Sequence, residues 1–140
     1  MSLSPTLVDS NVLIGAFNPK DEFHKPAARI LSQIEQGKVD KPIITDYILD
    51  EVLTFVRRRL GFDKSLEVLE SFLSSDTLGI EKVDEREFQA GIIIFEKNRR
   101  LSFTDAVSVA VMDSRDIRQI ISFDKDFDSV RGIERLPSPS

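Results

Sequence analysis

Short apolar runs alternate with longer helical patterns along the 140-residue chain. Apolar residues spaced three and four apart predict helices, whereas short runs rich in β-branched residues and bounded by turn residues predict strands. On this basis we expect strands at Leu7-Val8, Pro42–Thr45, Leu78–Val83, Ile117–Ser122 and Ile133–Leu136. Because helical segments lie between these strands, the pattern predicts an α/β fold with a parallel sheet that is covered on both faces.

The predicted helices carry their own start and stop signals. We expect them at Val12–Phe17, from Pro26 to Gly37, at Asp46–Leu60, from Asp63 to Leu73, at Asp84–Asn98 and from Ser102 to about Asp113. Proline is favoured at a helix start and glycine just after a helix end, as at Gly61. In the helix after Asp63, the spacing places four side chains inward: Leu66, Leu69, Phe72 and Leu73. His24 falls in the surface loop before Pro26.

Composition narrows the possible functions. The chain is 41% hydrophobic and 31% charged, which is typical of one globular domain, here residues 1–140 with a frayed tail at 137–140. The lack of cysteine and the single histidine exclude a disulfide scaffold, thiolate catalysis and a metal site built from several histidines. Without an export signal or an apolar stretch of about 20 residues, we expect a cytoplasmic protein with no membrane part.

The net charge is −5, from 19 Lys and Arg against 24 Asp and Glu. A protein that coats nucleic acid non-specifically is normally basic, so this balance argues against that class. An enzyme that gathers its acids in one place remains compatible with the same charge. The position of the acids along the chain therefore decides how the charge is interpreted.

Two acids follow predicted strands. Asp9 comes directly after Leu7-Val8, and Asp124 follows the strand that ends at Ser122. Ligands of parallel sheets gather beyond the carboxyl ends of the strands, where the strand order reverses. The alternative interpretations are an N-cap for Asp9 and a solvated acidic turn for Asp124, with Asp126 as the reserve candidate in that loop.

Two further acids lie on predicted helices. Glu51 falls on the flank of the broad apolar face of its helix, whereas Asp50 points toward solvent. Asp105 lies on a helix that is apolar almost all round, where an acid needs a hydrogen bond, a charged partner or a metal ion. The alternatives are a surface glutamate for Glu51 and a capping box with Ser102 for Asp105.

Convergence of these four carboxylates would require positive charge, because neighbouring carboxylates raise one another's pKa. No Lys or Arg lies within two residues of Asp9, Glu51 or Asp105. Oxygen-only ligands favour a hard divalent ion, Mg²⁺ or Mn²⁺. Such sites favour phosphoester hydrolysis, in which metal ions activate water and stabilise the leaving oxygen.

The ordered set of motifs resembles the PIN-domain nucleases, and most closely the VapC-like toxins of prokaryotic toxin–antitoxin pairs. The resemblance rests on residues 8–12, on Glu51 within its helix, on the Asp105-Ala106 helix start and on residues 122–127. It covers roughly Leu7 to Leu136. It implies a three-layer α/β/α fold with a central parallel sheet of four to five strands, and an Mg²⁺- or Mn²⁺-dependent endoribonuclease.

The resemblance also assigns roles to individual residues. It implies Asp9, Glu51, Asp105 and Asp124 as the catalytic and metal-binding acids, Asp126 as a ligand of a second ion, and Asn11 and Thr104 as supporting polar residues. The partners that it implies are an RNA substrate, an antitoxin protein and a second copy of the chain in a homodimer.

RNA also needs a basic contact surface. Arg58 returns to nearly the same helix face as Glu51, and Arg100 precedes the Asp105 helix, so both are candidate phosphate contacts. The alternative interpretation is that cations simply stabilise the carboxyl ends of helices. We expect the helical aromatic residues Phe55, Phe72, Phe88 and Phe95 in the core, not on a surface that stacks bases.

Other functions fit parts of this pattern. A PIN-type RNA-processing nuclease outside toxin–antitoxin systems would use the same acids. A non-catalytic α/β module that binds another protein would need no metal at all. A phosphotransfer receiver or haloacid-type phosphatase fits less well, because it expects an acidic cluster beside the first-strand aspartate, whereas Asn11 stands two residues after Asp9.

Overall fold

The computed structural model describes residues 4–136, so the expected frayed tail at 137–140 lies outside the described residues. Five short strands form one parallel sheet in the order β3-β2-β1-β4-β5. They are β1 (Thr6–Val8), β2 (Pro42–Thr45), β3 (Gly79–Glu81), β4 (Gln119–Ile121) and β5 (Glu134–Leu136). The strand order reverses at β1, which pairs with β2 on one side and β4 on the other. The expected α/β class and parallel sheet are confirmed.

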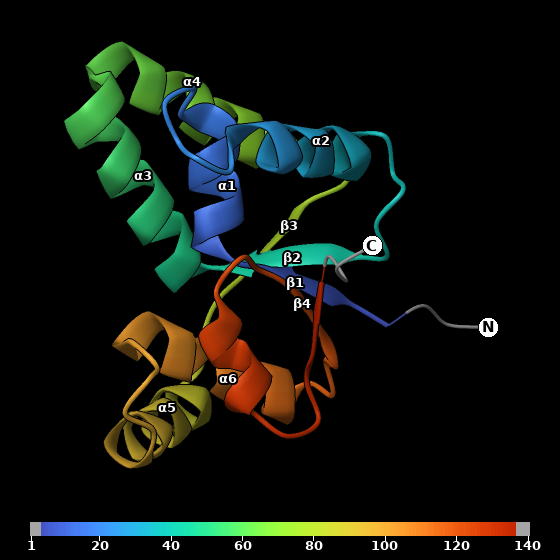
Figure 1. Cartoon of the computed structure of the whole chain (residues 1–140), viewed down its shortest axis with the longest axis vertical. Coiled ribbons are helices and arrows are strands. Elements are labelled where there is room, and N and C mark those ends of the chain that lie inside the picture. The colour runs from blue at the N-terminus through green and yellow to red at the C-terminus, as the bar shows by residue number, and fades with distance from the viewer. Residues whose placement is uncertain (1–3, 137–140) are drawn as a thin grey trace.

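Helices cover both faces of this sheet (Figure 1). One layer holds α1 (Ser10–Phe17), α2 (His24–Glu35), α3 (Asp46–Leu60) and α4 (Phe62–Leu73), and the other holds α5 (Glu85–Lys97) and α6 (Phe103–Ser114). A short 3₁₀ helix, η1 (Lys125–Ser129), connects β4 to β5. The three-layer arrangement is therefore confirmed. None of the helices within residues 4–136 is long and apolar enough to cross a membrane.

The helix α6 is the most deeply buried helix, because every residue from 106 to 112 is buried. It packs closely against α5 at Gly91, where a Cβ atom would stand 2.9 Å from Val107 Cγ2 and 3.1 Å from Val107 Cα. Glycine is thus required for the two helix backbones to approach this closely. The burial agrees with the apolar pattern of α6 and fixes the position of Asp105 in its first turn.

A buried ion pair also holds α5 and α6 together. Glu87 is 1% exposed and accepts hydrogen bonds from Arg115 at 2.8 Å and 2.9 Å, while Arg115 also donates to the Lys82 carbonyl at 2.8 Å. The hydrogen bonds from Arg115 are the largest influence on this carboxylate, and the pKa of Glu87 is lowered to about 2. Glu87 is therefore ionised at neutral pH although its side chain is almost inaccessible to solvent.

Several predictions for surface helices are wrong. Helix α2 begins at His24, not at Pro26, and His24 is half-buried with its Nδ1 atom 2.8 Å from the Gly15 carbonyl oxygen. Leu66 and Leu73 are 44% and 63% exposed, although their spacing predicted burial. The reason is that α4 packs mainly against α3, so its buried face is narrow and consists of Ser65, Val68 and Phe72. The prediction that Phe95 lies in the core is also wrong, because this side chain is 47% exposed.

Candidate active site at the carboxyl ends of β1 and β4

Asp9 lies at the point where the central strand β1 ends and α1 begins. Its backbone N–H donates to the Ile121 carbonyl at 2.9 Å, which continues the β1–β4 pairing by one residue. Its side chain caps α1, because Oδ1 accepts a hydrogen bond from the Ser10 amide at 2.8 Å. The side chain is also only 2% exposed, so Asp9 is both the N-cap of α1 and a buried carboxylate at the end of β1.

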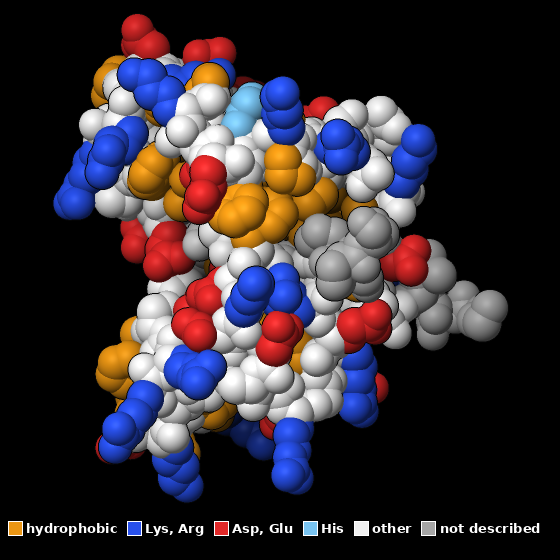
Figure 2. Space-filling view, in the orientation of Figure 1, with side chains coloured by type: hydrophobic (Ala, Val, Ile, Leu, Met, Phe, Trp, Pro, Cys, Tyr) orange, Lys and Arg blue, Asp and Glu red, His pale blue; other side chains and the backbone are white. Residues whose placement is uncertain are grey.

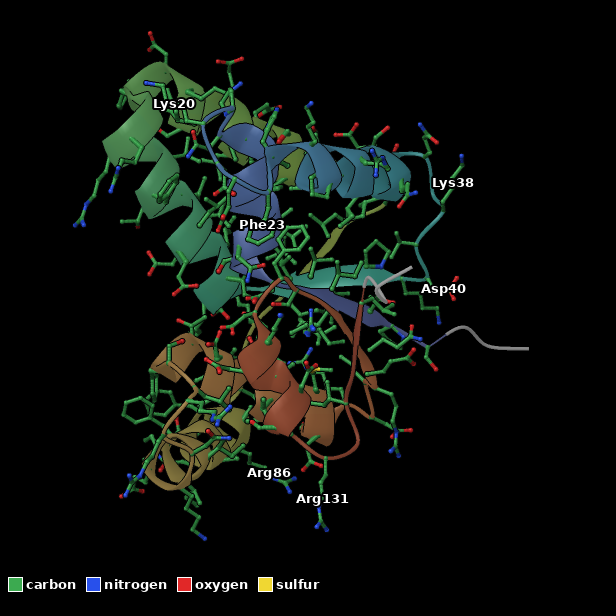
Figure 3. All side chains as sticks on the ribbon, viewed as in Figure 1. Lys20, Phe23, Lys38, Asp40, Arg86 and Arg131 are labelled. Atoms are coloured by element: carbon green, nitrogen blue, oxygen red, sulfur yellow. The ribbon has the colours of Figure 1, made fainter. Side chains whose placement is uncertain are left out.

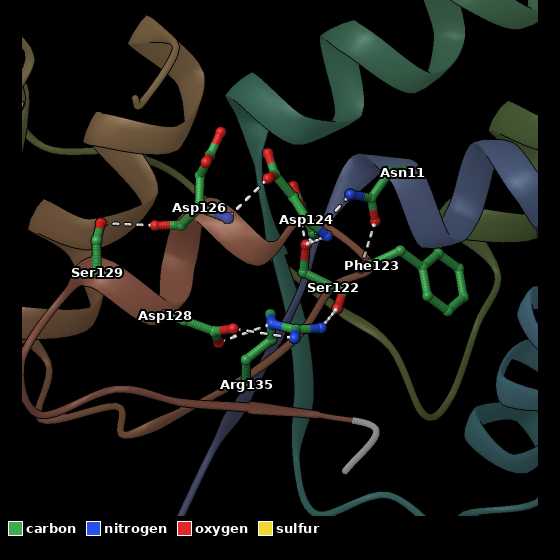
Figure 4. A network of polar contacts seen from close by, with 9 residues as sticks. Asn11, Ser122, Phe123, Asp124, Asp126, Asp128, Ser129 and Arg135 are labelled. Carbon is green, nitrogen blue, oxygen red and sulfur yellow. Dashed lines mark hydrogen bonds and ion pairs between the residues drawn. The ribbon is translucent and has the colours of Figure 1, made fainter. Parts of the chain in front are cut away.

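Ser122 holds the second oxygen of Asp9. The Ser122 hydroxyl donates to Asp9 Oδ2 at 2.7 Å and accepts hydrogen bonds from Asn11 Nδ2 at 3.2 Å and from the Asp124 amide at 3.0 Å. Asn11 is fixed in turn, because its Oδ1 accepts from the Phe123 amide at 3.3 Å. Figure 4 shows this network around Ser122, which uses the hydroxyl proton and both of its lone pairs. The orientation of Asp9 is therefore set from two strands.

Burial is the largest influence on the ionisation of Asp9 and raises its pKa from the ordinary 3.8 to about 7. The neighbouring carboxylates of Asp105 and Glu51 raise this pKa as well, whereas the hydrogen bonds from Ser122 and Ser10 lower it. Three of the four predicted acids are thus close enough to repel one another. A cation at this position would relieve both the burial cost and the repulsion.

Glu51 and Asp105 approach Asp9 from two helices. Glu51 is half-buried on α3, and its Oε1 accepts a hydrogen bond from the Ser10 hydroxyl at 2.8 Å. Asp105 forms the expected capping box with Ser102, through contacts of 3.1 Å and 3.4 Å. Burial is the main cause that raises the pKa of Asp105, and the carboxylates of Asp124 and Glu51 raise it further.

Asp124 lies with the other acids, since its charge raises the pKa of Asp105 and its side chain lines the same cleft as Glu51. It also caps η1, where its Oδ1 accepts from the Asp126 amide at 2.9 Å. Asp126 is half-buried one turn further on, and its carbonyl oxygen accepts from the Ser129 hydroxyl at 2.7 Å (Figure 4). These contacts favour Asp124 over Asp126 as the fourth member of the group.

The four acids approach one another without forming a ready coordination shell. Within residues 4–136, no three Asp, Glu or His side chains are gathered closely enough to hold one metal ion. The physical reason is that each outer carboxylate has a local hydrogen-bond donor, in Ser10 for Glu51, Ser102 for Asp105 and the Asp126 amide for Asp124.

The donor chemistry nevertheless fits a hard divalent ion. All ligands on offer are carboxylate oxygens, and no Lys or Arg is among the groups that shift the pKa of Asp9 or Asp105. The site therefore has negative charge that a bound cation would neutralise.

A cleft of about 720 Å³ opens beside these acids. Its walls come from α1, the segment before α2, α3 and the loop after β4, and they include Ser10, Asn11, Glu51 and Asp124. Arg58 and its neighbour Arg59 line the cleft from α3, and both are exposed. The walls also carry five acidic side chains, which are Asp21, Glu22, Asp50, Glu51 and Asp124.

Five of the predicted site residues are not among those that line this cleft: Asp9, Asp105, Asp126, Thr104 and Arg100. Arg100 is exposed in the loop between α5 and α6 and is not among the residues that line the cleft. Thr104 is half-buried in the first turn of α6, next to Asp105. The structure therefore does not bring either side chain to the wall of the cleft.

Sequence reasoning did not select several residues that shape the site. Ser10 and Ser122 directly follow Asp9 and β4, so the rule that selected Asp9 would also have selected them. Arg59 directly follows Arg58 in the sequence and also lines the cleft, although only Arg58 shares the helix face of Glu51. Phe23 had no sequence signal, because its position in the cleft depends on how the loop before α2 folds over the end of the sheet.

The chain is similar to known proteins in both sequence and fold. The model of the PIN-domain family matches residues 6–133. The chain belongs to the PIN-domain family. Enzymes of this family are typically metal-dependent nucleases, so the family agrees with the oxygen-only donor set of this PIN domain.

Curated relatives of this PIN domain are VapC ribonucleases. A VapC ribonuclease of Mycobacterium bovis is 32% identical over 138 residues, which cover 93% of this chain and 98% of that protein. A VapC ribonuclease of Archaeoglobus fulgidus is 30% identical over 125 residues, which cover 86% of this chain and 78% of that protein. The expected relationship to VapC-type ribonucleases is therefore confirmed.

Solved structures agree with the fold of this PIN domain. The Mycobacterium tuberculosis VapC20 structure, described as a toxin that cleaves the sarcin–ricin loop, has a TM-score of 0.76 at 25% identity. The match covers 89% of this chain and 93% of that one. A toxin–antitoxin complex from Klebsiella pneumoniae has a TM-score of 0.66 at 17% identity, over 92% of this chain and 95% of that chain, and supports the fold alone.

Proposed function

We propose that this PIN domain is an Mg²⁺- or Mn²⁺-dependent endoribonuclease, and that it is the toxin of a toxin–antitoxin pair. One observation carries the catalytic part of the proposal: a buried carboxylate, Asp9, ends the central strand, and burial and two other acids raise its pKa to about 7. The hydrogen bonds from Ser10 and Ser122 lower this pKa but do not offset the effect of burial, so a bound cation would stabilise the Asp9 charge further. The relationship to VapC ribonucleases supports RNA as the substrate.

The proposed metal ligands are Asp9, Glu51, Asp105 and Asp124, with Asp126 near enough in the chain to assist a second ion. When bound, a divalent ion supplies an activated water and charge neutralisation at the scissile phosphodiester. Ser122 keeps Asp9 oriented through its 2.7 Å hydrogen bond, and Asn11 keeps Ser122 oriented at 3.2 Å. These two residues therefore act as positioning residues, whereas Thr104 supports Asp105 from the same helical turn.

Arg58 and Arg59 provide the charge that an RNA backbone needs beside an acidic pocket. Both line the cleft and are exposed, so their guanidinium groups can bind phosphates without a large desolvation cost. Arg100 is the proposed contact for more distant phosphates. Electrostatic contacts of this kind weaken as salt concentration increases.

The proposed protein partners are an antitoxin and a second copy of the chain. Helix α4 presents three exposed apolar side chains, Phe62, Leu66 and Leu73, whose spacing places them on one face of the helix. Such a face suits a protein contact. Co-expression with the product of the neighbouring gene tests toxin status, since a cognate antitoxin would co-purify with the chain and suppress its ribonuclease activity.

The nuclease proposal is tested by comparing Asp9→Asn with Asp113→Asn in a cleavage assay on single-stranded RNA. Asp113 is an exposed acid on the same helix as Asp105 and serves as the matched control. We expect Mn²⁺ or Mg²⁺ to support cleavage, chelation to abolish it, and Asp9→Asn to lower kcat by about 100-fold or more. Full cleavage by carefully purified Asp9→Asn protein would overturn the proposal. Calorimetric titration with Mn²⁺ gives a second readout, in which only Asp9→Asn loses binding.

A further inference from the structure

Two phenylalanine rings are stacked in the cleft beside the acids. The ring centroids of Phe23 and Phe123 are 4.7 Å apart, and the ring planes are inclined by 15°. Both side chains line the cleft together with Glu51 and Asp124. Phe23 is 41% exposed, and Figure 3 labels it at the middle of the face where Figure 2 shows a patch of hydrophobic side chains. The stack therefore presents aromatic surface to the cleft.

The backbone holds both rings in place. The Phe23 amide donates to Asp21 Oδ1 at 2.8 Å, in a turn that leads directly into α2. The Phe123 amide donates to Asn11 Oδ1 at 3.3 Å, and Phe123 immediately precedes Asp124. Because Asn11 also binds Ser122, the aromatic stack and the Asp9 carboxylate share one supporting network. A pre-organised ring loses little conformational entropy when a ligand binds to it.

The remaining walls of the cleft indicate what kind of ligand would stack there. Arg58 and Arg59 supply cations, and the Arg59 guanidinium also lies 5.7 Å from the centroid of the Phe55 ring. The acids that line the cleft include Asp124, which follows Phe123, and Asp21 and Glu22, which precede Phe23. A ligand that fits all three features has a planar apolar part and an anionic part, and it brings a phosphodiester near a metal-binding site. An unpaired nucleotide within an RNA strand has this composition.

We propose that Phe23, supported by Phe123, is the stacking platform for an unpaired nucleobase next to the scissile phosphodiester. This inference rests on the proposed nuclease function and adds a specificity-determining residue to it: Phe23 would take up one base that is free to leave its helix, as in a loop or a single strand. Duplex RNA, whose bases are stacked on each other, is excluded from the platform. Stacking on one aromatic side chain contributes about 5- to 100-fold in affinity.

The test measures RNA binding, not cleavage, so its result is independent of the nuclease assay. In an Asp9→Asn background, which does not cleave the RNA, fluorescence anisotropy follows a labelled single-stranded RNA oligonucleotide and the same oligonucleotide with abasic sites. We expect Phe23→Ala to weaken binding of the intact RNA by about 5- to 100-fold and to leave the weaker binding of the abasic RNA unchanged. Phe23→Tyr restores binding, and Ile93→Ala, which shortens an exposed apolar side chain on α5 outside the cleft, has no effect.

Several results of the binding experiment would contradict the stacking platform. The platform would be overturned if Phe23→Ala left RNA binding unchanged or weakened the binding of intact and abasic RNA equally. It would also be overturned if the parent protein did not bind RNA. A Phe23→Ala protein that binds RNA normally but no longer binds a co-expressed antitoxin would overturn it as well, because the ring would then contact protein. Thermal unfolding of each variant confirms that the fold is intact.

A fluorescence reporter tests the same contact directly. The chain contains no tryptophan, so Phe23→Trp introduces a single indole at the platform. We expect single-stranded RNA to quench this indole and duplex RNA of the same sequence to quench it much less. Ile93→Trp, at an exposed position outside the cleft, is the control for quenching by non-specific association. Equal quenching of the two indoles would overturn the proposal.

Discussion

Replacing Asp9 by asparagine is expected to remove activity while stabilising the metal-free protein at neutral and alkaline pH. The pKa of Asp9 is raised from 3.8 to about 7, chiefly by burial. At about 1.4 kcal/mol for each tenfold change in proton affinity, keeping Asp9 ionised in the folded protein costs about 4 kcal/mol. Asparagine avoids this cost but loses the 2.7 Å hydrogen bond from Ser122, which is worth about 1–2 kcal/mol. The expected net gain is about 2–3 kcal/mol.

The pH dependence follows from the direction of the pKa change. Since the folded protein binds this proton more tightly than the unfolded chain, the contribution of Asp9 to the free energy of unfolding is greatest below about pH 4. This contribution declines as the pH rises toward about 7 and is constant above it. The asparagine side chain of the variant does not titrate, so the stability difference between the variant and the wild type grows over the same interval.

Urea unfolding followed by circular dichroism, with EDTA present, measures this difference at about pH 5 and about pH 8. We expect Asp9→Asn to gain stability over the wild type mainly at the higher pH. A variant that is less stable than the wild type at about pH 8, or a difference that is the same at both pH values, would refute the assignment of a buried, destabilised carboxylate. Asp113→Asn provides the control, because Asp113 is exposed.

Two further predictions concern the packing of α5 against α6. Glu87→Gln should lower the free energy of unfolding by about 2–3 kcal/mol at pH 7, because it breaks the buried pair with Arg115. This loss should shrink as the pH falls from about 4.5 toward about 2, where wild-type Glu87 is itself protonated. Urea unfolding across this pH range measures the loss, and Asp116→Asn, which breaks an exposed pair, should change the stability little. Gly91→Ala should lower stability by about 1–3 kcal/mol, because its Cβ atom would stand 2.9 Å from Val107 Cγ2; thermal unfolding checks it, and an unchanged or higher melting temperature would contradict the close packing.

The sequence by itself determined the elements and the order in which they occur. Helix α3 and strand β2 have the predicted bounds, because Thr45 caps the helix locally at 3.1 Å and Gly61 ends it with φ of 99°. The apolar pattern of α6 likewise predicted its burial. These features depend on hydrogen bonds between residues close in the sequence and on side-chain periodicity. Both can be predicted from the order of the residues alone.

The sequence also selected Asp9, Glu51, Asp105 and Asp124, but their mutual repulsion became evident only in the folded chain. The order β3-β2-β1-β4-β5 places the ends of β1 and β4 side by side, and this brings Asp9 to Ser122 across 113 positions of sequence. Such contacts depend on which strands become neighbours, and local patterns do not contain that information.

Tertiary structure alone decided which apolar residues remain exposed. The spacing of Leu66 and Leu73 is compatible with burial, yet α4 has a neighbour on only one narrow face. Phe23 likewise belongs to a loop without periodicity, and it stacks on Phe123 only because that loop covers the end of the sheet. Periodicity predicts which face of a helix is apolar, whereas the neighbouring elements decide how much of that face is buried. The neighbouring elements also decide which loop residues are left open to a ligand.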